Sequence, residues 1–313
     1  MRAAAFVALS LVVVFLVGEV LDRVSWVNPN TPKIREVLAL EGETNDVLYL
    51  GDSTTLDGVN PVEIESATGA RGYNLASGGQ SLLDAEMLLR HYLEHNAKPR
   101  MVMLGLFVNR SDPARELNPE IFFGLPSTMR GLMWEKADEQ AMTNATLSFR
   151  VFNWFKAYRY RTNITHLLDY LQKTLISKES RAKRFVRGHL ALDYTKKEKR
   201  VASTERSIAQ LNEVGLDSFL AFCSEQQIPV LLFEPPNTPG FSEITQGRSM
   251  ILAGIEQRVR ARRNLRFRSF NDLNSLTYAS DEWSGRNHLN SKGAIRFSRE
   301  QIAPFLQEAL SAR

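Results

Sequence analysis

The sequence is poor in the residues that build metal and disulfide sites. Of its 313 residues one is cysteine, Cys223, and five are histidine. One cysteine excludes a disulfide framework within the chain and a zinc site based on several thiolates, and the histidines do not gather with it in a cluster. We therefore expect neither a metal site nor a cofactor, although these counts leave a site made of carboxylates open. We expect Cys223 to be a small buried side chain.

The composition is otherwise that of a globular protein, with 43% hydrophobic and 24% charged residues, which excludes a disordered, collagen-like or coiled-coil chain. The net charge of +4 is unevenly spread. Residues 156–200 hold 13 Lys/Arg and 4 Asp/Glu, a net charge of +9, which leaves −5 for the rest of the chain. Such a basic segment is either a solvated helical face or a surface for an anionic partner, an acidic polymer or membrane headgroups.

The N-terminus carries an uncharged apolar run, residues 3–18, preceded by Arg2. The run continues past Glu19 to about the 20 residues that a membrane span needs, and the leading basic residue is typical of an export signal. No small-residue cleavage site follows, which favours a signal anchor over residues 1–24 rather than a cleaved signal peptide. We expect the N-terminus in the cytoplasm and the remaining chain in the periplasm or outside the cell, with no nucleic acid as partner.

Short apolar runs alternate with amphipathic stretches along most of the chain. We predict strands at 47–50, 72–76, 101–108, 228–233 and 265–270, and helices at 81–95, 207–226, 249–262 and 291–310. This alternation predicts an α/β fold with three layers, in which helices cover both faces of a mostly parallel sheet.

Two parts of the chain do not follow the alternation. Residues 25–46 contain the polar sequence Asn-Pro-Asn-Thr-Pro and are predicted as a linker and lead-in. Residues of about 111–200 have no clear strand, several aromatic side chains and the basic segment. We interpret them as a helical insertion within a larger domain that spans 47–313.

Four polar or glycine residues follow the ends of predicted strands: Ser53, Gly78, Asn109 and Glu234. In a parallel sheet with helices on both faces, the binding site lies beyond the carboxyl ends of the strands. The fold would therefore gather these residues at one edge of the sheet, although they are far apart in sequence.

Ser53 is a candidate nucleophile, because a serine directly after a strand is presented at the open edge of the sheet. A nucleophilic serine needs a base and an oxyanion hole. His288 precedes the last helix and is the histidine expected at this edge. The other histidines are expected on a helix face or exposed in the insertion: His91, His95, His166 and His189. The candidate oxyanion donors are the backbone amides of Ser53 and Gly78 and the side-chain amide of Asn109.

These residues lie in four short blocks that, in this order, resemble those of the SGNH (GDSL-like) hydrolase superfamily. The blocks are 51–53 (Gly-Asp-Ser), 74–79 (Asn-Leu-Ala-Ser-Gly-Gly), 105–109 (Gly-Leu-Phe-Val-Asn) and 288–293 (His-Leu-Asn-Ser-Lys-Gly). The third block has two more residues between Gly and Asn than the family's common Gly-x-Asn. The resemblance extends from residue 47 to the C-terminus, apart from the insertion, and implies an SGNH or flavodoxin-like sheet.

One position departs from the family. The family places an aspartate three residues before the histidine, where this chain has Gly285, and the nearest acids before it are Asp281 and Glu282. Three interpretations stay open. Asp281 reaches His288 from further back in the loop, a Ser-His dyad uses a backbone carbonyl, or the site has lost its activity.

The N-terminal run, the insertion and residues 233–237 (Phe-Glu-Pro-Pro-Asn) make the chain similar to membrane-anchored envelope proteins of the DltD, AlgJ and AlgX type. This resemblance implies a serine acylesterase or O-acyltransferase that acts on an envelope polysaccharide beside a membrane-bound O-acyltransferase. Two alternatives stay open: an inactive SGNH-like module that binds a polymer or scaffolds a membrane complex, and a secreted lipase or lysophospholipase with the aromatic insertion as its lid.

Overall fold

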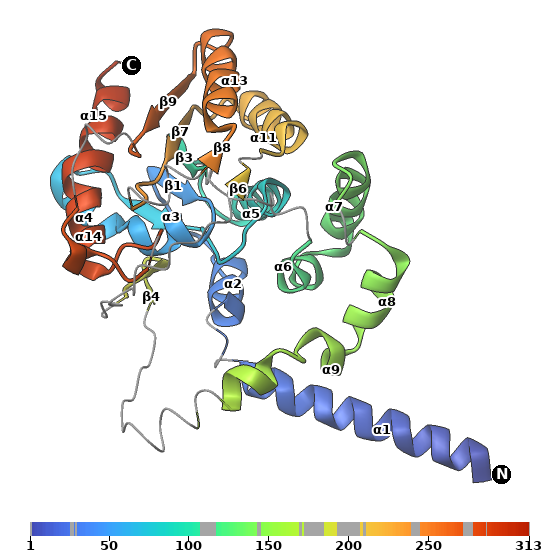
Figure 1. Ribbon diagram of the computed structural model, residues 1–313. Coiled ribbons are helices and arrows are strands. Elements are labelled where there is room, and N and C mark those ends of the chain that lie inside the picture. The colour runs from blue at the N-terminus through green and yellow to red at the C-terminus, as the bar shows by residue number, and fades with distance from the viewer. Residues whose placement is uncertain are drawn as a thin grey trace. The chain divides into compact units, whose positions relative to one another are not determined.

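The computed structural model of the chain forms two compact units (Figure 1). The first comprises Met1–Glu36 and Glu116–Lys183, and the second comprises Val37–Arg115 and Arg184–Arg313. The structure describes residues 2–25, 28, 30–106, 117–142, 145–168, 171, 185–192, 207–208, 211–238, 245–271, 278–285 and 287–312.

The second unit is built on a five-stranded parallel sheet. Its strands, in their spatial order, are β2 (Gly72–Asn74), β1 (Val47–Leu50), β3 (Met101–Gly105), β7 (Val230–Glu234) and β9 (Leu265–Ser269). Every pair of neighbouring strands runs parallel, and each strand overlaps one of the predicted apolar runs. The prediction of an α/β fold around a parallel sheet is therefore confirmed.

Both faces of β1 are buried. Val47 and Tyr49 lie in the same core cluster as Phe297 and other residues near the C-terminus, while Leu48 and Leu50, which point to the other face, are also fully buried. A near-continuous apolar run is what a parallel strand covered on both faces requires, and this is why the short run Val-Leu-Tyr-Leu was recognisable in the sequence.

The helices of the second unit connect these strands. They are α3 (Ser53–Gly58), α4 (Pro61–Thr68), α5 (Leu82–His95), α11 (Glu213–Glu225), α13 (Arg248–Arg260), α14 (Ser291–Phe297), the π-helix η3 (Ser298–Ile302) and α15 (Ala303–Ser311). α5 packs on α11, and α4 packs on η3 and α15. Figure 1 shows α4, α14 and α15 together on one side of the strands. Cys223, on α11, is buried as expected.

Three smaller elements complete the unit. β4 (Phe185–Val186) and β5 (His189–Leu190) form an antiparallel hairpin, β6 (Ser207–Ile208) pairs in parallel with β8 (Thr245–Gln246), and η2 (Ser280–Glu282) is a single 3₁₀ turn. The helix predicted from residue 207 begins instead at Glu213. Its start follows Asn212, whose side chain accepts a hydrogen bond from the backbone N–H of Gly215 and caps the helix.

The described elements of the first unit are helical. They are α1 (Arg2–Arg23), α6 (Pro119–Gly124), α7 (Ser127–Glu139), α8 (Leu147–Trp154), α9 (Lys156–Arg159) and the first residues of α2 (Asn30–Leu38), which continues into the second unit. α2 therefore occupies part of the stretch predicted as a linker. Among the described residues, α1 is the one helix long and apolar enough to span a membrane, a property that a signal sequence shares.

Candidate active site

Ser53 is the first residue of α3 and follows β1 after two residues. β1 lies between β2 and β3 in the sheet. After β1 the chain adds β2 on one side of β1, and β3 then joins on the other side, so the strand order reverses at β1. Ligands of parallel α/β sheets bind at the carboxyl ends of strands where the strand order reverses in this way. The side chain of Asp52 accepts hydrogen bonds from the backbone N–H and the hydroxyl of Thr54 at 2.9 and 2.6 Å, so Asp52 caps α3.

Two glycines allow α3 to pack directly on the strand ends. Gly51 has a φ of +140°, and a Cβ atom there would lie 2.4 Å from Oγ1 of Thr55. A Cβ atom at Gly105, the last residue of β3, would lie 2.0 Å from the same Oγ1 atom. The glycines of the Gly-Asp-Ser block and of the Gly-Leu-Phe-Val-Asn block thus make room for Thr55, which follows Ser53 by two residues.

The structure brings Ser53, His288 and Asp57 into one line of contacts. Oγ of Ser53 lies 3.5 Å from Nε2 of His288, and Nδ1 of His288 lies 2.7 Å from Oδ2 of Asp57. The Asp57 side chain is 7% exposed and that of His288 is 28% exposed. With its proton on Nδ1, His288 donates to Asp57 and turns an unprotonated Nε2 toward Ser53. The Ser–His distance is at the long end of the range for a hydrogen bond.

Asp57 was not predicted from the sequence. It lies four residues after Ser53 on α3, and residues at this spacing are neighbours on a helix surface. The sequence pattern Ser-x-x-x-Asp would have pointed to Asp57. To use this pattern one must know that residues 53–58 form a helix, and this Thr-rich stretch is too short to show an amphipathic period.

The sequence prediction that placed Asp281 beside His288 is wrong, because Asp57 occupies that place. The Asp281 carboxylate instead accepts a hydrogen bond from Nζ of Lys292 at 2.7 Å, and both side chains are exposed. This hydrogen bond lowers the pKa of Asp281 below its ordinary value.

The loop before α14 explains why Asp281 is directed away from the His288 ring. The chain doubles back, with a bridge between Trp283 and Leu289 and a hydrogen bond from the backbone N–H of Ser284 to the carbonyl of His288. Residue 281 is therefore brought next to Asn290, whose side-chain amide donates to the Asp281 carbonyl at 2.6 Å.

The rest of the His-Leu-Asn-x-x-Gly block has a packing explanation. Leu289 is buried in the core cluster, and the Asn290 side chain caps α14 by accepting from the N–H of Gly293 at 3.1 Å. A Cβ atom at Gly293 would lie 2.4 Å from the carbonyl oxygen of Glu282. Each residue of the block thus helps to hold the loop that carries His288.

The turn that contains Gly78 is tied to the backbone beside Ser53. The N–H of Ser77 donates to the carbonyl of Gly51 at 3.2 Å, and the N–H of Gly51 donates to Oε1 of Gln80 at 2.9 Å. Gly79 has the positive φ of +69° that this turn requires, which separates its role from that of Gly78. Asn109, the third candidate oxyanion donor, lies outside the described residues.

Asn74, in the same block, fixes the end of α3. Its side-chain amide donates to the carbonyls of Thr55 and Val59 at 3.0 and 2.9 Å, and its Oδ1 accepts from the N–H of Ala76 at 2.9 Å. Carbonyls at a helix end otherwise lack partners. Because Asp57 lies between Thr55 and Val59, Asn74 also positions the acid.

The hairpin of β4 and β5 packs beside α3. Nδ1 of His189 lies 3.1 Å from the carbonyl of Leu56, and Leu190 and Leu192 form a small core with Leu56. His189 is therefore buried, contrary to the expectation from the sequence, whereas His166 is exposed as expected. The hairpin residues therefore cover Leu56 of α3 and bury it.

Glu234 ends β7 at the same edge of the sheet, as predicted, and is fully buried. Its carboxylate receives two hydrogen bonds from the guanidinium of Arg248 and further hydrogen bonds from the Ser269 hydroxyl and the Asn271 side-chain amide. Because the carboxylate is bonded to these side chains, we interpret Glu234 as a residue that holds the ends of β7 and β9 together, and not as a group that transfers protons.

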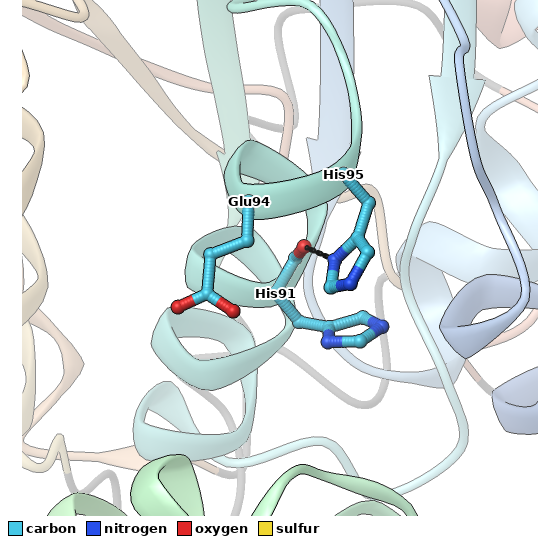
Figure 2. A group of neighbouring side chains, drawn as sticks. All are labelled: His91, Glu94 and His95. Carbon is cyan, nitrogen blue, oxygen red and sulfur yellow. Dashed lines mark hydrogen bonds between the residues drawn. The ribbon is translucent and has the colours of Figure 1, made fainter.

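Among the described residues, one group of side chains has the composition and spacing to hold a metal ion: His91, Glu94 and His95, whose ligand atoms lie within 4.8 Å of one another (Figure 2). Nε2 of His91 bonds to the carbonyl of Leu38, and Nδ1 of His95 bonds to the carbonyl of His91. The group lies at the C-terminal end of α5, which precedes the amino end of β3. It is therefore separated from Ser53 by the length of the sheet.

The close packing of Thr55 leads to a prediction. Gly105→Ala is expected to lower the free energy of unfolding by about 1–3 kcal/mol, and to slow any reaction of Ser53, because α3 must shift. Thr55→Ala removes the Oγ1 atom and should recover part of this loss in the double variant. Thermal unfolding of the four proteins measures the coupling.

Gly131→Ala in α7 is the matched control, since nothing lies within 4 Å of a Cβ atom there, and no loss of stability is expected. Losses from Gly105→Ala and Thr55→Ala that simply add in the double variant would show that the two sites do not interact.

The sequence matches no protein-family model, and no curated protein matches it.

Proposed function

We propose that this chain is a membrane-anchored serine acylesterase or O-acyltransferase of the SGNH type, with a three-layer α/β/α domain, that acts on an acylated envelope polysaccharide. The observation that carries the proposal is the line of contacts from Ser53 through His288 to the buried Asp57. A buried carboxylate at Nδ1 orients the imidazole and stabilises its charged form, as in a Ser-His-Asp triad.

The chemistry proceeds in two halves. As Oγ of Ser53 attacks the carbonyl carbon of an ester, Nε2 of His288 takes the serine proton, and the C–O bond to the leaving alcohol breaks as His288 returns that proton to it. The acyl-enzyme is then attacked by a hydroxyl of an acceptor sugar or by water. His288 again removes the proton and gives it back to Ser53, while Asp57 stabilises the imidazolium in both halves.

The oxyanion of each tetrahedral intermediate would be held by the backbone amides of Ser53 and Gly78, with Asn109 as the third donor. The support for Gly78 is the bonding of its turn to Gly51, which fixes the turn beside the nucleophile. Preorganised donors of this kind stabilise the developing charge without reorganising during the reaction.

In this proposal α1 is a single-pass anchor in the inner or plasma membrane, and the second unit lies in the periplasm or outside the cell. Its support is the length and apolar character of α1. A membrane-bound O-acyltransferase would be the partner that supplies or receives the acyl group.

The proposal is tested with a fluorophosphonate probe on the full chain in lipid nanodiscs. We expect labelling of the wild type, none of Ser53→Ala, and greatly slowed labelling of His288→Ala. His95→Ala serves as the matched control, because this histidine is exposed and belongs to α5, and it should label like the wild type. Folded wild type that never labels, or labelling that persists in Ser53→Ala, would contradict the proposal.

A further inference from the structure

The inference concerns the first unit and starts from the contacts at the end of α1. Nζ of Lys156 lies 2.9 Å from Oε1 of Glu19 and 2.8 Å from Oδ2 of Asp22. The side-chain amide of Asn163 donates to the carbonyl of Leu21 at 3.2 Å. These contacts hold α9 and the turn after it against the last turns of α1.

The two helices approach closely at Gly18, where a Cβ atom would lie 2.8 Å from the backbone nitrogen of Ala157. A bilayer core is spanned by about 20 helical residues, and α1 has 22. If α1 spans the membrane, as the proposed function has it, Glu19 and Asp22 lie where it leaves the hydrocarbon. α9 then lies at the depth of the lipid headgroups.

α8, directly before α9, carries an exposed apolar stripe. Leu147, Val151 and Trp154 are 73%, 47% and 69% exposed, and their spacing of four and three residues places them on one face of the helix. The opposite face carries Phe149 and Asn153, which are buried. Leucine and tryptophan turned away from the packed side are typical of a helix that lies in a membrane interface.

A cavity of about 990 Å³ lies beside this stripe, lined by α6, α7, α8 and α9. Its apolar lining includes Phe122 and Trp134, and its cationic lining includes Arg130, Arg150 and Arg159. The guanidinium of Arg150 lies over the Trp134 ring at 5.1 Å, and that of Arg159 lies over the Phe123 ring at 4.0 Å.

Within the described ranges, none of these three arginines is ion-paired with a carboxylate. Arg130 donates to the carbonyl of Leu125 at 3.2 Å, and Arg159 donates to that of Asn153 at 2.8 Å. Arg159 also interacts electrostatically with the Glu120 carboxylate. Among the described residues, the positive charges of Arg130 and Arg150 have no carboxylate partner and lie beside an apolar wall. That combination fits a ligand with an anionic head and an apolar tail.

We propose that the cavity and the exposed stripe of α8 bind anionic phospholipid of the bilayer that α1 spans. Phosphate oxygens are bonded by the guanidinium groups of Arg130 and Arg150, and Leu147, Val151 and Trp154 enter the interface beside the acyl chains. The contacts of α9 with α1 place the cavity next to the membrane that α1 spans. The charges of Arg130 and Arg150 then favour anionic over zwitterionic lipid.

The experiment reconstitutes the full chain in nanodiscs of phosphatidylcholine that contain rising amounts of either brominated phosphatidylglycerol or brominated phosphatidylcholine. Bromine quenches tryptophan fluorescence on contact, and the signal of Trp154 is taken as the difference between the wild type and Trp154→Phe. We expect quenching at a lower fraction of the glycerol lipid than of the choline lipid.

Arg130→Gln/Arg150→Gln is expected to raise the fraction of phosphatidylglycerol needed for half-quenching by about fivefold or more, since one basic residue near an anionic surface contributes about this factor. Arg130→Lys/Arg150→Lys keeps the charge and should keep most of the preference. Arg263→Gln/Arg266→Gln, in the second unit, is the matched control and should not change it.

Equal quenching by the two lipids, an unchanged preference in the Gln variant, or no quenching of Trp154 would each overturn the proposal. A chain that does not remain with the nanodiscs would overturn it as well, because the placement of α9 rests on the anchoring of α1. The Ser53→Ala variant separates the two proposals. It is expected to bind lipid like the wild type, so a failure of the serine chemistry leaves the quenching result intact.

Discussion

Asp57→Asn is expected to lower kcat/KM for a small activated ester by about 1,000- to 10,000-fold. The asparagine side chain has nearly the same shape, so the fold should remain. It lacks the negative charge that stabilises the His288 imidazolium, and its amide can favour the wrong tautomer of the ring. Hydrolysis of p-nitrophenyl acetate by the full chain, together with the rate of fluorophosphonate labelling, measures the loss.

Asp281→Asn is the matched control, because it changes the acid that the sequence suggested. Its carboxylate binds the exposed Lys292, so we expect kcat/KM within about twofold of the wild type, as for other surface ion pairs. The assignment of Asp57 would be wrong if the two variants exchanged these results, or if a folded Asp57→Asn protein kept full activity.

Arg248→Met is expected to lower the free energy of unfolding by about 3–5 kcal/mol, the largest stability loss predicted for this chain. The substitution removes the guanidinium that bonds to Glu234 and leaves a carboxylate of zero exposure without its main partner. Urea unfolding of the full chain in detergent micelles measures the change.

Two further variants make this prediction specific. Glu234→Gln/Arg248→Met removes both charges and should recover much of the loss, since replacing both partners of a buried pair is far less costly than removing one. Arg268→Met breaks the pair between Arg268 and Glu308, whose side chains are 37% and 55% exposed, and should cost about 1 kcal/mol or less. A loss from Arg248→Met no larger than that from Arg268→Met would contradict the buried-pair argument.

The fold was predictable where burial leaves a continuous apolar run. The runs at β1, β3 and β7 are fully buried, and their spacing with amphipathic helices was enough to predict a parallel sheet. α3 was not predicted over its length, because its six residues include one large apolar side chain, Leu56, and therefore no apolar stripe that would mark a helical period. α2 was missed because Asn-Thr-Pro reads as a turn signal, whereas Asn30 begins a helix.

The site was predictable only in part, for a related reason. Ser53 and His288 stand out by residue type and by their position after a strand and before a helix. Their acid could not be chosen by distance along the chain from His288, because the loop between Trp283 and Leu289 reverses direction. Asp281, seven residues away, thereby ends beside Lys292, while Asp57, 231 residues away, ends at Nδ1.

The placement of Ser53 and Asp57 on one six-residue helix determines how the site can be switched. The two groups are joined through a single turn of backbone, whose ends are held by Asp52 and Asn74, so they move together as one rigid piece. Of the three residues, His288 is therefore the one that can change its position relative to the other two, through its loop. In the proposed function, a substrate or partner that displaced this loop by about one ångström would separate Nε2 of His288 from Ser53 and Nδ1 from Asp57 at the same time, and a displacement of this size can slow a reaction strongly.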